Sequence, residues 1–100
     1  MMFGTIYRMK VKPGKKDGAT RAMMEDVREI EGFVSAYVYD TGGDELWGVA
    51  VFRDEESYRA NANDPEQDKW YRRLREHLEA DPEWHDGSIR AWPGDDRTPR

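Results

Sequence analysis

The sequence predicts a single α+β domain with the element order βαββαβ, and three observations lead to this prediction. Two apolar strand-like runs, residues 32–39 and 45–52, flank a short polar segment with two adjacent glycines, which is the pattern of a β-hairpin. An amphipathic helix pattern precedes this hairpin and a helical segment follows it. A further strand-like run lies toward each end of the chain. One hundred residues suffice for one domain with one core.

The first strand is expected between residues 2 and 11. Phe3, Tyr7, Met9 and Val11 alternate there with more polar residues, and a period of two is typical of a strand with one face more buried than the other.

The first helix is expected to follow the turn at Lys12–Gly14. Apolar residues recur at helical spacing from Ala19 through Val27 to Ile30, which predicts an amphipathic helix. Gly32 is expected to end it, because glycine readily takes the left-handed conformation found at helix ends.

The hairpin strands are apolar on both faces. Phe33 and Tyr37 alternate with Val34 and Val38, and the second strand, residues 45–52, has the same character. An antiparallel sheet with helices on one side usually has a polar second face. The sequence therefore predicts that a second copy of the chain covers this face, sheet against sheet.

Capping residues mark the second half of the chain. Asp54 is a suitable N-cap for a short helix over residues 55–62, and Asp64 followed by Pro65 starts a longer helix expected to reach about residue 79. Residues 83–92 are expected to form the last strand. Together the elements predict a ferredoxin-like α+β sandwich with an antiparallel sheet.

Composition excludes several classes of partner. The net charge is −5 with no basic run, which argues against nucleic acid or an anionic membrane surface. No cysteine is present, so disulfides and thiolate metal sites are excluded. No segment approaches the roughly 20 apolar residues of a membrane span, and we expect a cytoplasmic protein. The domain is predicted to cover residues 1–92, with a solvated polar tail at 93–100.

Three junctions resemble a known family. They are residues 11–15 (VKPGK), 32–34 (GFV) and 52–60 (FRDEESYRA). With the element order, these stretches are similar to the antibiotic biosynthesis monooxygenase-like family of the dimeric α+β barrel superfamily. The resemblance covers the chain from about Phe3 to about Trp92 and includes no catalytic signature. It implies a homodimer formed through the sheets and one of several functions, among them cofactor-independent oxidation of aromatic polyketides and haem degradation.

Trp70 and His77 are the first candidate site residues. They lie seven residues apart, two turns of a helix, so both are expected on one side of it. In the haem-degrading branch, the resemblance implies a tryptophan and an iron-binding histidine on this helix, with an asparagine on the first strand. This chain offers Thr5 and Tyr7 on that strand but no asparagine. The alternative for His77 is a partly buried structural histidine.

The resemblance also implies that asparagine, tryptophan, tyrosine and arginine line the cavities of cofactor-independent monooxygenases. The candidates on this basis are Tyr7, Tyr37, Tyr39, Trp47, Asn61, Asn63, Trp70, Tyr71 and Arg90. Together with His77, the site residues selected are Trp70, Tyr71 and Asn63. The alternative is that the aromatic residues fill the core and the dimer interface and that Asn63 serves a turn.

The sequence therefore predicts a small monooxygenase-like oxidoreductase that needs no cofactor and acts on an aromatic or quinone-like molecule. Phosphate loops, nucleophile elbows and paired-histidine metal motifs are absent from it. Two alternatives stay open. One is a non-catalytic homodimer that binds a small apolar molecule, and the other is a haem-binding or haem-degrading protein.

Overall fold

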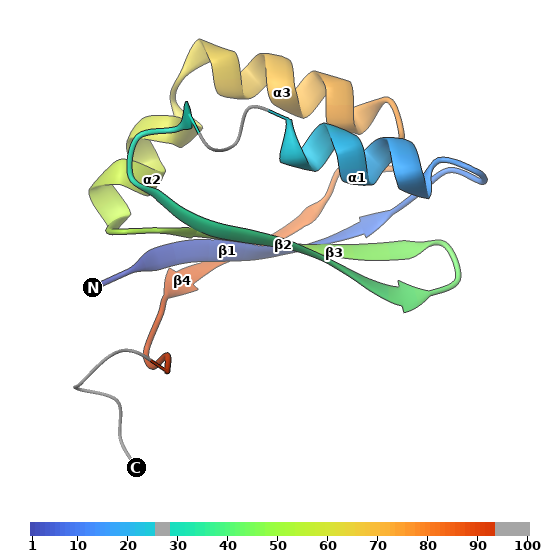
Figure 1. The fold of residues 1–100 in the computed structure, drawn as a ribbon. Helices are drawn as coiled ribbons and strands as arrows, with labels where there is room; N and C mark the ends of the chain where they lie inside the picture. The colour runs from blue at the N-terminus through green and yellow to red at the C-terminus, as the bar shows by residue number, and fades with distance from the viewer. Residues whose placement is uncertain (26–28, 94–100) are drawn as a thin grey trace.

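A computed structural model describes residues 1–25 and 29–93 of the chain and gives a two-layer α+β fold. The helices cover one face of a four-stranded sheet (Figure 1). The ferredoxin-like α+β fold predicted from the sequence is confirmed. In chain order the elements are β1 (Phe3–Lys10), α1 (Lys16–Met24), β2 (Phe33–Gly42), β3 (Glu45–Phe52), α2 (Glu55–Ala62), α3 (Pro65–Arg75) and β4 (Glu83–Ser88).

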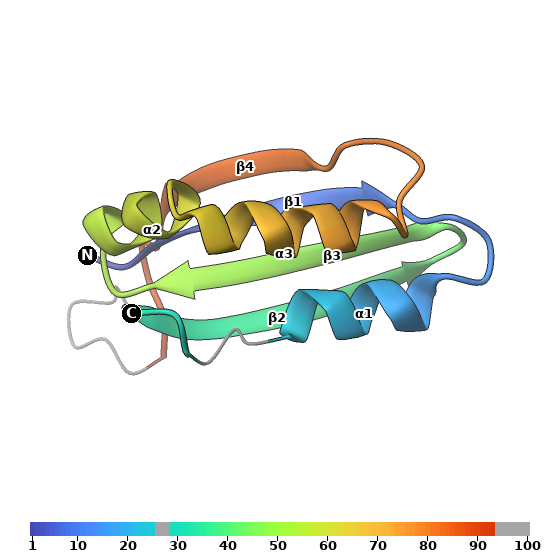
Figure 2. The same cartoon turned by 90° about the horizontal axis from the view of Figure 1, so that it is seen from above.

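The strands lie in the order β2-β3-β1-β4, and each adjacent pair is antiparallel (Figure 2). β1 is therefore central, with β3 on one side and β4 on the other. In the β1–β3 register Tyr7 lies opposite Gly48 on the helix side, and Ile6 lies opposite Val49 on the other side. The alternation predicted for the first strand is confirmed, since Phe3, Tyr7 and the other apolar members of that face are buried.

Two helix starts follow the predicted capping chemistry. The Asp54 carboxylate accepts a hydrogen bond from the Ser57 backbone N–H at 2.8 Å, and α2 begins at the next residue. The Asp64 carboxylate accepts from the Glu66 backbone N–H at 2.9 Å, with Pro65 as the first residue of α3. Each cap satisfies a backbone donor that has no partner inside the helix.

The core lies between the central strands and the pair α1 and α3. Helices packed on one face of a sheet bury one stripe of each helix against that face, and the side chains here interdigitate from both layers. The largest fully buried side chains are those of Met9, Met23, Leu46, Leu74, Leu78 and Val11.

The first helix is shorter than the sequence predicts. α1 ends at Met24, because Glu25 already has extended backbone angles, whereas the expected helix reached Ile30. Val27, a member of the predicted apolar stripe, lies outside the described residues. Gly32 does take a positive φ of 81°, and it directly precedes β2, eight residues after the end of α1. A Cβ there would lie 2.4 Å from the Cβ of Ser57, so this close approach to α2 also requires glycine.

The last helix and the last strand are also shorter than predicted. α3 ends at Arg75 and not near residue 79, because the next residues pair with the end of β1. The Lys12 N–H donates to the His77 carbonyl, and the Glu79 N–H donates to the Lys10 carbonyl, both at 2.9 Å. β4 ends at Ser88, before residue 92, and residues 85–87, which the sequence suggested as an interruption, pair with β1 inside this strand.

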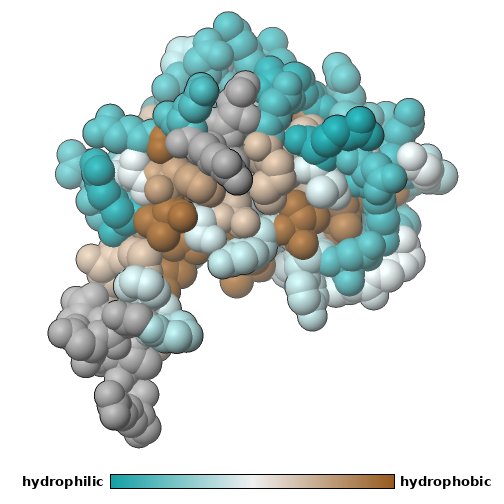
Figure 3. Space-filling view, viewed as in Figure 1, coloured by the Kyte–Doolittle hydropathy of each residue, from teal (hydrophilic) through white to brown (hydrophobic). Residues whose placement is uncertain are grey.

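The sheet face turned away from the helices, called the outer face here, carries exposed apolar side chains. Ile6 is 48% exposed, Tyr37 63% and Tyr39 65%. Figure 3 shows the hydrophilic surface gathered over the helix layer and hydrophobic surface below it, toward the sheet. The apolar members of the outer face are Ile6, Tyr37, Tyr39, Trp47, Val49 and Val51.

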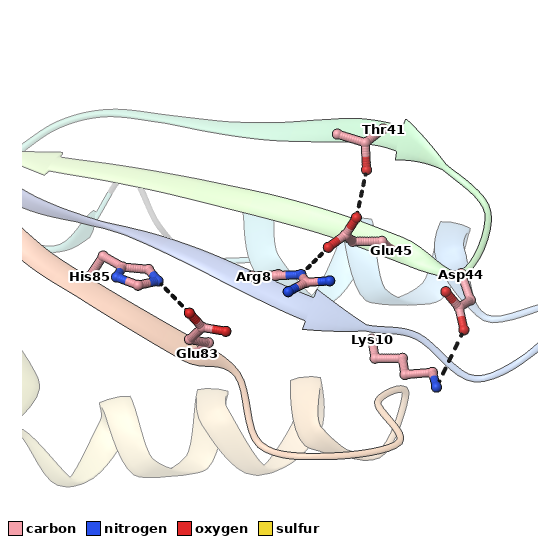
Figure 4. A network of polar contacts seen from close by, with 7 residues as sticks. All are labelled: Arg8, Lys10, Thr41, Asp44, Glu45, Glu83 and His85. Atoms are coloured by element: carbon pink, nitrogen blue, oxygen red, sulfur yellow. Dashed lines mark hydrogen bonds and ion pairs between the residues drawn. The ribbon is translucent and has the colours of Figure 1, made fainter.

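Charged pairs lie at one end of the outer face (Figure 4). Arg8 forms an ion pair with Glu45, which also accepts a hydrogen bond from the Thr41 hydroxyl at 3.1 Å. Lys10 lies 3.8 Å from the Asp44 carboxylate. Exposed pairs of this kind add little to stability, but they satisfy the charges of this strand within one chain.

Within the described residues, no helix has both the length and the apolar character required to cross a membrane. Of the predicted tail, only exposed Pro93 belongs to the described part of the chain, and residues 94–100 lie outside it.

The contact between Tyr7 and Gly48 gives a first testable prediction. A Cβ at residue 48 would lie 2.1 Å from Cζ of Tyr7, whereas one at Gly87 would meet nothing within 4 Å. Gly48→Ala should lower the free energy of unfolding by about 1–3 kcal/mol, because the buried ring must move. Gly87→Ala, the matched control in another strand, should stay within about 0.5 kcal/mol of the original protein. Urea denaturation measures both, and equal stabilities would contradict the packing described.

Candidate functional site

A cavity of about 70 Å³ lies between the sheet and the helices. Its walls come from β1, β3 and β4 on one side and from α2 and α3 on the other, with α1 and the start of β2 at one end. No charged side chain of the described residues lines it. Such a space suits a small uncharged molecule, because an unpaired charge would be costly to bury there.

Aromatic rings form one wall of this cavity. The rings of Tyr7 and Trp84 stack with their centres 4.6 Å apart, and both residues line the cavity. Burial raises the pKa of Tyr7 far above its ordinary value, and Tyr58 adds to this rise. Tyr7 therefore stays neutral at physiological pH, and the stacked pair forms an uncharged aromatic wall of the cavity.

The polar end of the cavity is formed by Thr5 of β1 and Tyr58 of α2, and Asp86 of β4 contacts Tyr58 from outside the lining. The Tyr58 hydroxyl donates a hydrogen bond to the Asp86 carboxylate at 2.8 Å. Asp86 reaches this position because it lies opposite Thr5 in the β1–β4 register. Burial raises the pKa of Tyr58 to about 12, the hydrogen bond and charge of Asp86 add to the rise, and the neighbouring Thr5 hydroxyl opposes it.

The cavity adjoins a surface groove of about 690 Å³. The groove is lined by seven carboxylate residues and two arginines, Arg53 and Arg73. The Asn61 amide donates to the Gln67 side-chain oxygen at 3.2 Å at the boundary between the two spaces. The residues that line both are Ile30, Asn61, Gln67 and Trp70, and this boundary is therefore the natural entrance.

The predicted site residues occupy different places. Trp70 lines the cavity. Tyr71 lies outside it, with its hydroxyl donating to Asp81 at 2.7 Å. Asn63 is exposed at the end of α2, where its backbone N–H donates to the Arg59 carbonyl at 3.1 Å. Of the two asparagines, Asn61 is the one beside the cavity.

His77 does not share a helix face with Trp70, because α3 ends at Arg75. Nδ1 of His77 lies 3.0 Å from the Arg73 carbonyl, and since a carbonyl only accepts, Nδ1 carries a proton. A Cβ on Gly18 would lie 2.7 Å from the imidazole ring, so His77 packs against α1. This position favours the structural alternative, and a catalytic role for His77, Tyr71 or Asn63 stays a prediction.

Haem ligation is not supported by the described residues. His77, the histidine that the resemblance makes the iron ligand, does not line the cavity. The first strand contributes Thr5 and Tyr7 to the cavity, and it has no asparagine, as the sequence showed.

Sequence reasoning did not identify Tyr58, Asp86 or Trp84 as site residues. Tyr58 and Asp86 are 28 residues apart and come together only through the sheet and helix packing. The one local signal was Thr5, a polar residue on the buried side of the first strand.

Comparisons with known proteins agree with this fold. No family model matches the sequence, and a search of curated proteins finds no match. Among solved structures, a candidate antibiotic biosynthesis monooxygenase from Chloroflexus aurantiacus is 24% identical, with a TM-score of 0.78 over 94% of this chain and 98% of that one. A monooxygenase from Streptomyces coelicolor, solved with the ligand nanaomycin D, is 23% identical, with a TM-score of 0.76 over 91% of this chain and 89% of that one.

A third similar structure is a variant of SnoaB, a cofactor-independent oxygenase from Streptomyces nogalater. It is 14% identical, with a TM-score of 0.78 over 94% of this chain and 98% of that one. The resemblance to antibiotic biosynthesis monooxygenases is thus confirmed at the level of the fold. Other structures of the same fold have no known function.

The half-buried Tyr58 at the polar end predicts a pH dependence. Tyr58 has an ordinary pKa of 10.0 and a pKa of about 12 in the folded protein, so between these values the unfolded chain has released a proton that the folded chain keeps. Stability should therefore fall as the pH rises from about 10 to about 12. Tyr58→Phe should show a smaller fall. Urea midpoints across this range measure the effect, and equal falls in both proteins would contradict it.

Proposed function

We propose that this protein is a small cofactor-independent monooxygenase-like oxidoreductase that acts on an aromatic or quinone-like molecule. The observation that carries the proposal is the uncharged cavity between the sheet and the helices, with Trp70, Trp84 and Tyr7 around it. Stacking surfaces of this kind bind flat rings. A site closed to water also protects a reactive intermediate from side reactions.

The proposed reaction needs no external reductant. A phenol and dioxygen give a quinone and water, with one oxygen atom entering the ring, the other leaving as water, and all four electrons coming from the phenol. The protein's part is to bind the ring, exclude water and accept the phenolic proton. The Tyr58–Asp86 hydrogen bond offers a route for that proton to a carboxylate at the protein surface.

The structural relatives support this proposal through the fold. SnoaB is a cofactor-independent oxygenase, and the Streptomyces coelicolor monooxygenase was solved with nanaomycin D bound. Identities of 14% and 23% show the fold alone, so the activity and the substrate class of this chain are proposals that rest on the cavity.

The proposal includes a homodimer formed through the outer face. Ile6, Tyr37 and Tyr39 are exposed there in one chain, and exposed apolar patches of this kind mark interaction sites. The Arg8–Glu45 pair leaves few unpaired charges to bury in such an interface. A second copy supplies a matching apolar surface, as two-fold interfaces require.

Two further parts of the sequence-based hypothesis belong to this proposal. One is a cytoplasmic location, which fractionation of the source cells checks. The other is a domain of residues 1–92, which should fold without the tail, as unfolding of a chain truncated after Trp92 checks. A homodimer that binds the molecule without turnover is the alternative to the monooxygenase.

Oxygen uptake tests the activity. With an electron-rich phenol or hydroquinone as substrate and no added metal or flavin, the protein should consume oxygen faster than the uncatalysed reaction. Trp70→Phe should keep part of the rate, and Trp70→Ala should lower it at least about tenfold, equivalent to roughly 1.4 kcal/mol. The control Glu76→Lys changes an exposed residue at the end of α3 and should leave the rate unchanged. A rate no higher than the uncatalysed one would favour the non-catalytic alternative.

Light scattering tests the dimer. Ile6→Lys should give a folded monomer, because a side chain that is 48% exposed in one chain tolerates a charge there, while an unpaired lysine buried in an interface does not. Glu76→Lys, a charge change on the helix layer, should remain dimeric. A monomer mass for the original protein at micromolar concentration would refute the dimer.

A further inference from the structure

The Thr5 hydroxyl is the buried polar group at the cavity that the fold leaves unpaired. Thr5 is 5% exposed, and its Oγ1 makes no hydrogen bond to any described residue. Thr5 lines the cavity together with Tyr58. Buried hydroxyls almost always have a partner, so an exception needs an explanation.

The neighbours of Thr5 do not supply that partner. The Tyr58 hydroxyl donates its proton to Asp86 at 2.8 Å, and its oxygen could still accept a hydrogen bond. Thr5 is near enough to lower the pKa of Tyr58, but the two hydroxyls do not have the geometry of a hydrogen bond. The cross-strand neighbours of Thr5 are Ala50 on β3 and Asp86 on β4. Ala50 has no polar side-chain atom, and the Asp86 carboxylate accepts from Tyr58 but makes no hydrogen bond with Thr5. A molecule in the cavity is the remaining partner.

We infer that the Thr5 hydroxyl is the hydrogen-bond site for a neutral hydroxyl or carbonyl oxygen of a single-ring aromatic ligand, of the phenol or quinone class. The ring would stack beside Tyr7 and Trp84, and its oxygen would point to β1. This inference adds a specific ligand contact to the proposed function, and it rests on the proposal that this cavity is the binding site. It assigns Thr5 a binding role that determines specificity.

Charge and size narrow the ligand class. No charged side chain of the described residues lines the cavity, and the Asp86 carboxylate lies behind Tyr58, so a ligand that enters as a carboxylate would have no counter-charge. The volume of about 70 Å³ is below the roughly 150 Å³ of an apolar cavity known to hold benzene in another protein. The cavity must therefore expand to hold even one ring, and flexible side chains such as Met23 and Met24 can move to allow this.

Thr5→Val separates binding from stability, because valine keeps the shape and removes the hydroxyl. The probes are phenol, benzene and benzoate, and titration followed by protein NMR gives their affinities. The original protein should bind phenol and benzene but not benzoate. Thr5→Val should weaken phenol about fivefold to tenfold, the range of one neutral hydrogen bond, and leave benzene unchanged.

The unliganded variant should be more stable than the original protein. Removing a buried hydroxyl that has no partner relieves its desolvation cost, and a rise in melting temperature of about 4 °C or more is expected for a domain of this size. Thr41→Val is the matched control. Its hydroxyl donates to Glu45 far from the cavity, so phenol affinity should not change.

Several results would overturn the inference. A lower melting temperature of Thr5→Val with unchanged phenol affinity would show that Thr5 is paired inside the protein. Equal losses of affinity for phenol and benzene would show that the substitution changed the shape of the cavity and did not remove a hydrogen bond. If the original protein does not bind phenol, the cavity is not a phenol site. If Thr5→Val does not fold, Thr5→Ser must keep the phenol preference that Thr5→Ala loses. Thr5-dependent phenol binding without oxygen uptake would refute the monooxygenase alone, because binding needs no turnover.

Discussion

The alternation of side chains along β1 is the constraint on which the rest of the structure depends. β1 is the central strand, so its register with β3 and β4 fixes both faces of the sheet. On the helix side Tyr7 lies over Gly48, where any larger residue would collide with the ring, and Thr5 faces the cavity. On the outer face the same strand presents Ile6 and Arg8. A slip of one residue in the register would exchange the side chains of the two faces. The cavity and the proposed interface therefore both depend on the register of β1.

Local chemistry made much of the fold predictable. Asp54 and Asp64 cap their helices through atoms two or three residues away, so the sequence contained the whole signal. The positions at which the helices and strands end were not predictable in this way, because they depend on residues far away in the sequence. α3 stops at Arg75 since the following residues pair with Lys10 and Lys12, and no periodicity within the helix encodes that pairing. This end also separates His77 from Trp70, which the two-turn spacing had placed together.

The candidate site was less predictable than the fold for the same reason. Trp70 was identified from its residue type and its place on the last helix, through the family resemblance. Tyr58 and Asp86 come from α2 and β4, and their contact requires the complete sheet. The short polar run around Asp86 suggested a break in the last strand, whereas in the structure this run is an edge strand whose inward side chains complete the cavity.

The surface around the entrance favours the same ligands as the cavity. Among the described residues, the adjoining groove carries seven carboxylate residues against two arginines, within a chain of net charge −5. Its potential therefore repels anions over about the 8 Å screening length of physiological salt. An aromatic carboxylate would be opposed first at the groove and again in the uncharged interior, where Thr5 and Tyr58 offer hydroxyls but no positive charge. A neutral phenol meets neither barrier. The groove and the cavity therefore both favour neutral over anionic aromatic ligands, although the residues they have in common are those at the entrance.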